Sequence, residues 1–419
     1  MDDNKLGLRE LAHKLGPGLI TGASDDDPSG ILTYLQAGVM LGLNSLWVAL
    51  ISLPLMYAVQ EMCARLGLVT GKGLIKLIKE NYSKAVLYPI ALVSLVVISV
   101  NIGADLMAIG VVLEKMTGWS RLILVPLVSL VIVLVIVKFS YHNFARIMKW
   151  LTISLFAYVA VAFYVKIDWV MAFYHTISPS LQFTKANGLL LAAMLGTTIS
   201  PYLFFWQTSE EVEERNAKRR ESIFKSFIPN KHELKLMRAD TFVGMLFSNV
   251  VMWFIIVSAS QLKNLYGVTQ ITNFDEASRV LEPLLGHQAY FLFSLGIIGT
   301  GLLAIPVLAG SIGYILAEIF GWREGINKKF HQAEGFYWAI IGATTIGCAL
   351  TLLGLDPVNL LVYTAVAYTI ITPPIIYFII KLANNHDLMK HKINDRLDNL
   401  LSWGAFAVMT FAAVFYLVS

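Results

Sequence analysis

Charged residues are scarce in this chain, and cysteines are scarcer still. Only 14% of the 419 residues are Asp, Glu, Lys or Arg, against about 25% in soluble globular proteins. This composition excludes a disordered chain and a soluble cytosolic enzyme. The net charge of +4 gives no indication of nucleic-acid binding. Cys63 and Cys348 both lie in apolar segments, so we expect neither a disulfide framework nor a thiolate metal site.

Apolar residues, in contrast, make up 57% of the chain, and the mean hydropathy is +0.66. A membrane-spanning helix needs about 20 mostly apolar residues. The apolar runs therefore predict an all-α integral membrane protein with about eleven transmembrane helices and no soluble domain. The predicted spans are residues 16–42, 44–64, 86–113, 120–137, 147–165, 187–209, 239–261, 288–319, 335–353, 357–380 and 401–418. The polar segment 265–286 is predicted to form a helix in an external loop.

The basic residues predict how the chain lies in the membrane. If the amino end is cytoplasmic, all but six of the 32 Lys and Arg residues fall in cytoplasmic segments, which is the expected excess of positive charge on that side. The six in outer segments are Lys115, Arg121, Lys166, Lys185, Lys263 and Arg279. We therefore expect a multi-pass protein of the cell membrane with its amino end inside and its carboxyl end outside. Its partner is then the lipid bilayer, and its oligomeric state is left open, with a monomer as one option.

Charged residues at membrane depth are costly, so each is a candidate for function. Four of the acidic candidates have a structural explanation. We expect Glu61 to pair with Arg65 on a helix surface. Asp240 is expected at the membrane interface, and Glu318 in water near a cytoplasmic end. Asp356 precedes a proline in a tight turn and is expected to cap the next helix.

Asp25, Asp26 and Asp27 interrupt the first apolar run and are followed directly by Pro-Ser-Gly. Each residue of an α-helix turns by about 100°, so three consecutive carboxylates cannot share one face. Proline removes a backbone donor and glycine tolerates non-helical torsions, so the helix is expected to break here. Irregular backbone at membrane depth is tolerated where it is buried in protein or lines a wet cavity. The alternative is that the first span begins only at Ile31 and that the acids lie in water.

A second interruption lies in the sixth span, at residues 196–202, where Pro201 follows Thr197, Thr198 and Ser200. Matching broken helices in two halves of a chain are typical of inverted-repeat transporters, whose site lies between the breaks. The first repeat would comprise residues 16–165 and the second residues 187–380, with 401–418 as an added helix. The breaks offer carboxylates, hydroxyls and freed carbonyls but no Lys or Arg. Such donors favour a hard cation such as Mg²⁺, Ca²⁺ or Mn²⁺.

At these residues the chain resembles the Nramp family of divalent-metal transporters. The resemblance begins at residues 16–18, continues through 27–30, 36–38 and 64–72, and recurs at 104–106 and 196–202. It implies a LeuT-like fold of five plus five inverted helices and one more, with helices 1 and 6 unwound around the metal. It also implies a transporter rather than an enzyme.

The chain departs from the family's two metal-binding motifs. The motif of span 1 reads Asp-Pro-Gly-Asn, and here Asp27 is kept but Gly30 stands at the asparagine position. The motif of span 6 reads Ala-x-x-Met-Pro-His, and those positions hold Thr197, Ser200, Pro201 and Tyr202. Loss of the methionine sulfur removes the preference for softer ions, and the smaller residues enlarge the pocket, which suits a partly hydrated Mg²⁺. This pattern resembles the Nramp-related magnesium transporter branch.

The family's proton route is altered as well. Its span 3 pattern is Asp-x-x-Glu, and here Asp105 is kept while Ala108 replaces the glutamate. Tyr202 does not titrate near neutral pH. We therefore expect import of Mg²⁺, and also of Mn²⁺, by alternating access with little or no proton coupling. The alternatives are a proton-coupled Mn²⁺/Fe²⁺ transporter of the ordinary Nramp type and, from another class, an intramembrane metal-dependent enzyme.

The predicted metal site has Asp27 as its central ligand, supported by Gly30, Thr197 and Ser200. A second group is expected to line the ion pathway or to support the ligands. Its members are Asp25, Asp26, Ser29, Thr198, Tyr202 and Asp105. No catalytic residue and no resident cofactor are expected, since the Mg²⁺ or Mn²⁺ ion is the transported substrate.

Overall fold

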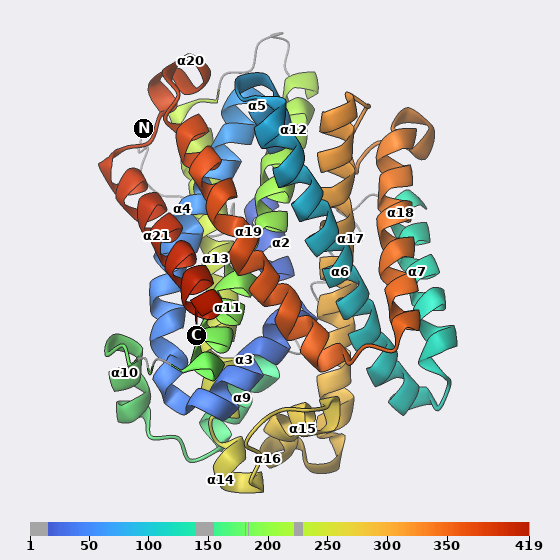
Figure 1. Ribbon diagram of the computed structural model, residues 1–419, viewed down its shortest axis with the longest axis vertical. Coiled ribbons are helices and arrows are strands. Elements are labelled where there is room, and N and C mark those ends of the chain that lie inside the picture. Colours follow the sequence, from blue (N-terminus) through green and yellow to red (C-terminus); the bar gives the residue numbers. More distant parts are fainter. Residues whose placement is uncertain (1–15, 139–154, 181, 183, 222–228, 419) are drawn as a thin grey trace.

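The computed structural model describes residues 16–138, 155–180, 182, 184–221 and 229–418, and all regular secondary structure within them is helical. Long helices run side by side in an elongated bundle (Figure 1). They are α4 (Leu46–Thr70), α6 (Lys84–Thr117), α7 (Arg121–Lys138), α13 (Lys231–Ala259), α17 (Ala289–Phe320), α18 (Glu334–Leu350), α19 (Pro357–Ala383) and α21 (Arg396–Val418). Two further pairs of helices belong to the bundle: α2 (Pro17–Asp25) with α3 (Pro28–Leu41), and α11 (Lys185–Thr198) with α12 (Pro201–Glu221).

Nine segments of the described residues are long and apolar enough to cross a membrane. One of them, 28–70, contains α3 and α4 in succession. The nine segments therefore cover every predicted span except the fifth and the part of the first that precedes residue 28. The fifth span is described only from residue 155, just before α9 (Phe156–Tyr164), and its earlier part lies outside the described residues.

Both predicted helix breaks are present. The first separates α2 from α3 at Asp26 and Asp27, which have ψ angles of 58° and 171° and so leave the helical region. The second separates α11 from α12, and proline begins the helix after each break, where its missing N–H is not needed. Because α2 is helical and the three acidic side chains are buried, the first span does not begin at Ile31.

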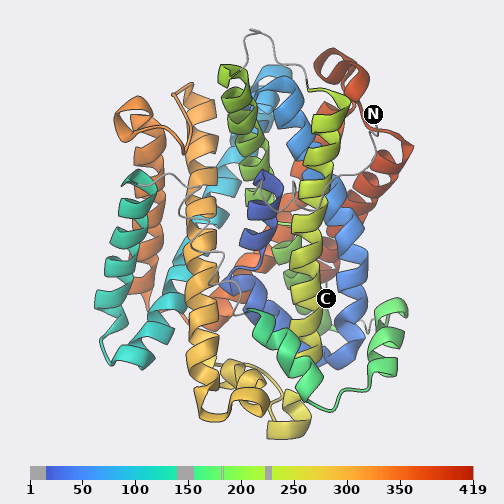
Figure 2. The ribbon, with the colours of Figure 1, turned by 180° about the vertical axis from the view of Figure 1, so that it is seen from behind.

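The broken helices lie in the middle of the bundle. Helix α2 is central in both views, flanked by α13 and by α17 (Figures 1 and 2). Helix α3 also packs on α13, while α11 packs on α19 and α12 packs on α4 and α17. The two breaks are therefore enclosed by unbroken helices, which is the condition for irregular backbone at membrane depth.

Glycines allow α2 to approach α13 very closely. A Cβ atom added at Gly22 would lie 2.2 Å from the backbone of Gly244, and one added at Gly244 would lie 2.1 Å from the Gly18 carbonyl oxygen. Small residues permit such contacts between membrane helices because no side chain keeps the backbones apart. The position of α2, and hence of the break that follows it, depends on this contact.

Gly22→Ala is expected to lower the thermal stability of the purified protein. Alanine favours a helix over glycine by about 1 kcal/mol, but the added methyl would collide with Gly244, and overpacking costs about 1–3 kcal/mol. Gly342→Ala is the matched control, since a Cβ atom there meets nothing within 4 Å. Its midpoint of thermal unfolding in detergent should be unchanged or slightly higher. Equal midpoints for the two variants would contradict the close packing of α2.

Glu61 and Arg65 form the predicted ion pair, at 2.9 Å, but the pair is buried rather than on a helix surface. Arg238 from α13 also contacts Glu61, at 2.7 Å. Arg65 Nη2 donates to Asn394 Oδ1 at 2.6 Å, just before α21 begins. The charges are thus neutralised inside the bundle, in a cluster that joins α4, α13 and the start of α21.

The other three acidic side chains cap or support helix ends. The prediction that Glu318 is solvated is wrong, because Glu318 is buried and accepts a hydrogen bond from the Lys76 N–H at 2.7 Å. Asp240 is half-buried and accepts one from the Gly18 N–H at 2.7 Å, at the start of α2. Asp356 caps α19 as predicted, accepting from the Asn359 N–H at 2.8 Å.

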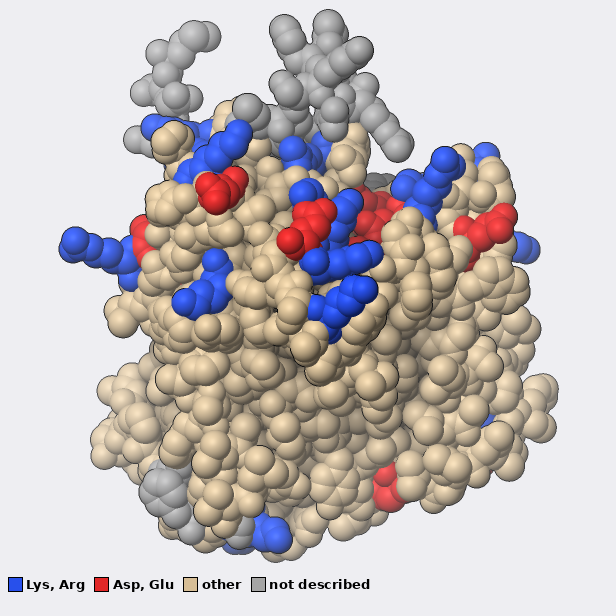
Figure 3. Space-filling model, turned by 45° about the horizontal axis from the view of Figure 1, so that its top comes forward, with Lys and Arg blue, Asp and Glu red and all other residues tan. Residues whose placement is uncertain are grey.

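The two ends of the bundle differ in charge and in structure. Lys and Arg side chains gather at the end that carries α5 (Leu74–Asn81) and α20 (His386–Met389) (Figure 3). The opposite end carries α10 (Trp169–Ile177) and the predicted external loop. The loop is not a single helix as predicted, but a series of short ones: α14 (Leu262–Tyr266), α15 (Phe274–Ser278) and α16 (Glu282–Leu285). Glycine and asparagine between its apolar residues interrupt it.

Candidate metal site

Asp27 is the first residue of the site because it sits at the break itself. It is the N-cap of α3, and its Oδ1 accepts a hydrogen bond from the Gly30 N–H at 2.7 Å. Its Oδ2 accepts one from Asn101 Nδ2 on α6 at 3.0 Å. Only 2% of Asp27 is exposed. A carboxylate has about four acceptor positions, so each oxygen retains lone pairs that a cation can use.

Gly30 marks the point where the two breaks meet. A Cβ atom added there would lie 3.2 Å from Thr197 Oγ1 and 3.5 Å from both Asp27 Oδ1 and the Asp25 carbonyl oxygen. The three oxygens are a hydroxyl, a carboxylate and a freed main-chain carbonyl, and they come from both broken spans. The structure therefore brings Asp27, Gly30 and Thr197 together.

Ser200 lies in the second break, and its hydrogen bonds stay within that break. Its Oγ is 2.8 Å from the carbonyl oxygens of Gly196 and Thr197. The hydroxyl thus satisfies acceptors at the end of α11 that have no helical partner. Its hydrogen is used in this way, and only its lone pairs remain for an ion.

Three of the predicted second group hold helices together. Ser29 Oγ donates to the Leu361 carbonyl of α19 at 2.8 Å. Tyr202 OH donates to the Ser24 carbonyl at 3.0 Å and so joins the two broken spans. Thr198 Oγ1 lies 3.0 Å from Tyr34 OH and joins α11 to α3. These bonds position the breaks.

Two of the three consecutive acids face one helix, and the third faces another. Ser248 Oγ on α13 lies 2.6 Å from Asp25 Oδ2 and 3.2 Å from Asp26 Oδ1. Asp27 instead contacts α6 through Asn101. Asp25 and Asp26 are fully buried, and each has one oxygen without a hydrogen-bond partner among the described residues. Their side chains therefore belong to the α2–α13 contact.

Asn101 is a site residue that the sequence analysis missed. Besides donating to Asp27, its Nδ2 lies 3.4 Å from Asp105 Oδ2, one helical turn further along α6. Asp105 was found because its charge is conspicuous in an apolar run. The signal available in the sequence was that Asn101 is polar and lies four residues before Asp105, which places both side chains on the same face of the helix.

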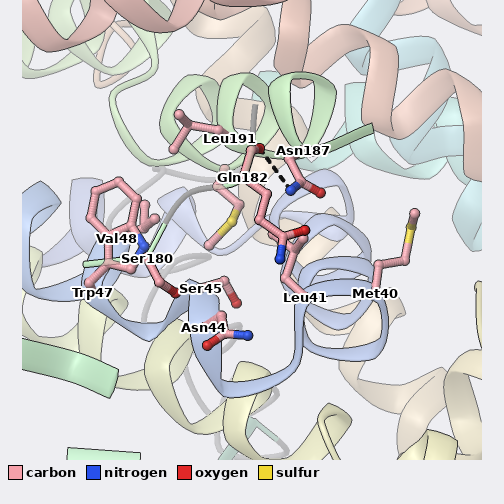
Figure 4. A pocket seen from close by; sticks show the side chains of 11 residues that line it. Met40, Leu41, Asn44, Ser45, Trp47, Val48, Ser180, Gln182, Asn187 and Leu191 are labelled. Carbon is pink, nitrogen blue, oxygen red and sulfur yellow. Dashed lines mark hydrogen bonds between the residues drawn. The ribbon is translucent and has the colours of Figure 1, made fainter. Parts of the chain in front are cut away.

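A cavity of about 600 Å³ lies at the ends of α3 and α11 that are far from the breaks. Figure 4 shows the amide side chains of Asn44, Gln182 and Asn187 around it, and none of the described residues that line it is charged. The bond between Tyr34 and Thr198 joins the same two helices nearer the breaks. The break residues are buried, so the cavity and the site are separated.

The oxygen atoms nearest to Gly30 belong to different chemical groups. Across the described part of the chain, no group of three or more His, Cys, Asp or Glu side chains is arranged to hold a metal ion. The atoms around Gly30 are oxygens of three chemical kinds, with one carboxylate among them. Oxygen donors of this kind fit a hard divalent cation.

A comparison with protein families decides what kind of chain this is. The model of the Nramp family, described as natural resistance-associated macrophage protein-like, matches residues 18–419. The chain belongs to the Nramp family. This agrees with the resemblance seen at the two breaks, and it extends that resemblance to nearly the whole length.

Curated Nramp relatives are similar over almost their full lengths. The divalent metal cation transporter MntH of Klebsiella pneumoniae strain 342 is 24% identical over 401 residues, which cover 94% of this chain and 91% of that protein. MntH 1 of Pseudomonas aeruginosa is 23% identical over 417 residues, covering 97% and 91%. Both are named as transporters, in agreement with the expectation of a transporter rather than an enzyme.

Solved structures confirm the predicted fold. The manganese transporter of Eremococcus coleocola superposes with a TM-score of 0.78 at 14% identity, covering 100% of this chain and 88% of that one. The inward-facing conformation of Mhp1 gives a TM-score of 0.53 at 12% identity, covering 97% and 89%. The chain therefore has the LeuT-like architecture with helices 1 and 6 unwound.

The Nramp motif positions also show how two of the departures are related. Gly30 replaces the family's asparagine and Thr197 replaces its alanine, and these two residues face each other across the breaks. The Thr197 hydroxyl therefore lies beside the position at which the family motif has asparagine. That the substitutions enlarge the pocket stays a prediction.

Proposed function

We propose that this Nramp protein imports divalent cations, principally Mg²⁺ and also Mn²⁺, by alternating access around Asp27. The observation that carries the proposal is the group of three oxygens around Gly30, drawn from both breaks. Neither a thioether nor an imidazole belongs to this group, so it offers no soft ligand to favour a transition metal. The relatives named as manganese or divalent metal transporters support a divalent substrate.

The ion is proposed to keep part of its water shell. Mg²⁺ requires six ligands in a near-octahedral arrangement and usually retains several waters. The three atoms nearest to a Cβ added at Gly30 are all protein oxygens, and the Ser200 hydroxyl donates to carbonyls of its own break. Water would complete the coordination.

The membrane potential is the proposed driving force. It supplies about 2.3 kcal/mol per elementary charge per 100 mV, and twice as much for a divalent ion. At two positions of the family's proton route this chain has Ala108 and Tyr202, and the Tyr202 hydroxyl is engaged by the Ser24 carbonyl. With the amino end inside, as the basic residues at one end of the bundle favour, an inside-negative potential drives uptake.

The test is Mg²⁺ uptake by sealed proteoliposomes at a fixed membrane potential, read by an internal Mg²⁺ dye with a pH dye in parallel. We expect saturable uptake that accelerates as the interior is made more negative, with no acidification beyond that of empty vesicles. Mn²⁺ uptake accompanied by acidification, without Mg²⁺ uptake, would replace the proposal by a proton-coupled Mn²⁺/Fe²⁺ transporter.

A further inference from the structure

On α6, Asn101 contacts both the Asp27 carboxylate of the first break and the Asp105 carboxylate of its own helix. It is fully buried, with Nδ2 3.0 Å from Asp27 Oδ2 and 3.4 Å from Asp105 Oδ2. Its Oδ1 has no hydrogen-bond partner among the described residues. A buried amide oxygen without a partner is unfavourable, so this atom needs a donor that the polypeptide does not supply.

The charges around Asn101 determine which way its amide points. Ionised carboxylates only accept hydrogen bonds, while the amide nitrogen has two hydrogens to donate. The nitrogen must therefore face Asp27 and Asp105, which leaves the oxygen as the free end. Rotating the amide by 180° would set Oδ1 against the carboxylate oxygens.

Two further unpartnered groups belong to the same region. Among the described residues, neither Asp105 Oδ1 nor the hydroxyl of Tyr368 on α19 has a hydrogen-bond partner, and both are buried. The Tyr368 ring lies 5.7 Å from the ring of Tyr202, whose hydroxyl joins the two broken spans. A partly hydrated cation presents water hydrogens outward. Surroundings that recognise it must therefore offer acceptors, as Asn101 Oδ1 and Asp105 Oδ1 do.

We propose that Asn101 is a specificity-determining residue that selects a hydrated ion. Its Nδ2 holds the Asp27 carboxylate in position, and its Oδ1 accepts a hydrogen bond from a water molecule bound to the ion. This inference rests on the proposed uptake of Mg²⁺ and extends it to a residue outside both breaks. Mg²⁺ gives up its waters reluctantly, so it depends on this acceptor more than an ion that sheds water readily.

The test compares KM for Mg²⁺ and for Mn²⁺ in Asn101→Leu, Asn101→Thr and wild-type proteoliposomes. Leucine matches asparagine in size but neither donates nor accepts, and loss of an outer-shell partner typically weakens metal binding by about 10–100-fold. We expect KM for Mg²⁺ to rise by about that factor in Asn101→Leu, and KM for Mn²⁺ to rise several-fold less. Threonine keeps a group that donates and accepts, and should hold the ratio of the two KM values within about threefold of wild type.

Asn249→Leu is the matched control. Asn249 is also a buried asparagine, but its bonds go to Ser52 and Met56 of α4 and to the Met245 carbonyl, and none goes to a residue of either break. This variant should leave the ratio of KM values unchanged even where it lowers stability.

The outcomes separate this inference from the proposed function. Wild-type Mg²⁺ uptake together with an unchanged KM ratio in Asn101→Leu would overturn the role of Asn101 alone. Absence of wild-type Mg²⁺ uptake would overturn the proposed function, and this inference with it. If Asn101→Leu does not fold, Asn101→Ala replaces it as the variant without an acceptor, and an unchanged KM ratio in that folded variant would overturn the role of Asn101.

Discussion

Asp27→Ala is expected to abolish uptake of both Mg²⁺ and Mn²⁺. Asp27 supplies the carboxylate among the oxygens that meet beside Gly30, and it is buried, so water cannot replace its charge. Loss of an outer-shell partner alone weakens metal binding by about 10–100-fold. Loss of the central ligand should lower the flux by more than about 100-fold. The measurement is dye-reported uptake in proteoliposomes at a fixed potential.

Asp27 also caps α3, so its removal has a structural effect that must be separated from the chemical one. Loss of an N-cap costs about 0.5–2 kcal/mol. Asp27→Asn is the matched control, because its amide oxygen can still accept from the Gly30 N–H while the charge is lost. We expect it to be as inactive as Asp27→Ala, with a thermal midpoint close to wild type. Uptake within tenfold of wild type by folded Asp27→Asn would show that Asp27 is not the central ligand.

Ser200→Met is expected to move the preference from Mg²⁺ toward Mn²⁺. The substitution restores a thioether at the position where the family motif has methionine, and sulfur ligands favour transition metals over Mg²⁺. The ratio of KM for Mg²⁺ to KM for Mn²⁺ should rise by at least about tenfold, which corresponds to about 1.4 kcal/mol. Competition between the two ions in the same vesicles measures this ratio directly.

The size of methionine and the lost hydroxyl must be separated from the effect of sulfur. Ser200 is fully buried and satisfies the carbonyls of Gly196 and Thr197, so a larger side chain costs about 1–3 kcal/mol through overpacking. Ser200→Leu has similar bulk without sulfur. It should lower uptake of both ions and leave their KM ratio near that of wild type. Equal ratios for the Met and Leu variants would exclude a ligand role for position 200.

The family assignment sharpens the meaning of these two experiments. Relatives over nearly the whole chain carry the name divalent metal cation transporter, while the chain departs from the family motifs at the two helix breaks. The Asp27 variants test a residue that this chain shares with the family motif. The Ser200 variants test a position at which this chain differs from the motif. Loss of uptake in the first, together with a shifted ratio in the second, would place the selectivity of this protein in the span 6 break.

The sequence by itself determined the membrane class, the spans that the structure describes and both helix breaks. These features are local: an apolar run of sufficient length forms a helix in the membrane, and a proline after polar residues ends it. The position of Asp27 and the capping role of Asp356 follow from neighbours within a few residues along the chain. Such features need no knowledge of which helices are adjacent.

Only the tertiary structure decided where each polar side chain points and what it meets. Gly30 and Thr197 face each other although they are far apart in the sequence. Asn101 was found only because α6 brings it to Asp27, and Glu318, expected in water, is buried against the Lys76 backbone. Burial and hydrogen bonding depend on the packing of neighbouring helices. Hydropathy averages over a span, and so it cannot distinguish the face that meets the site from the face that meets lipid.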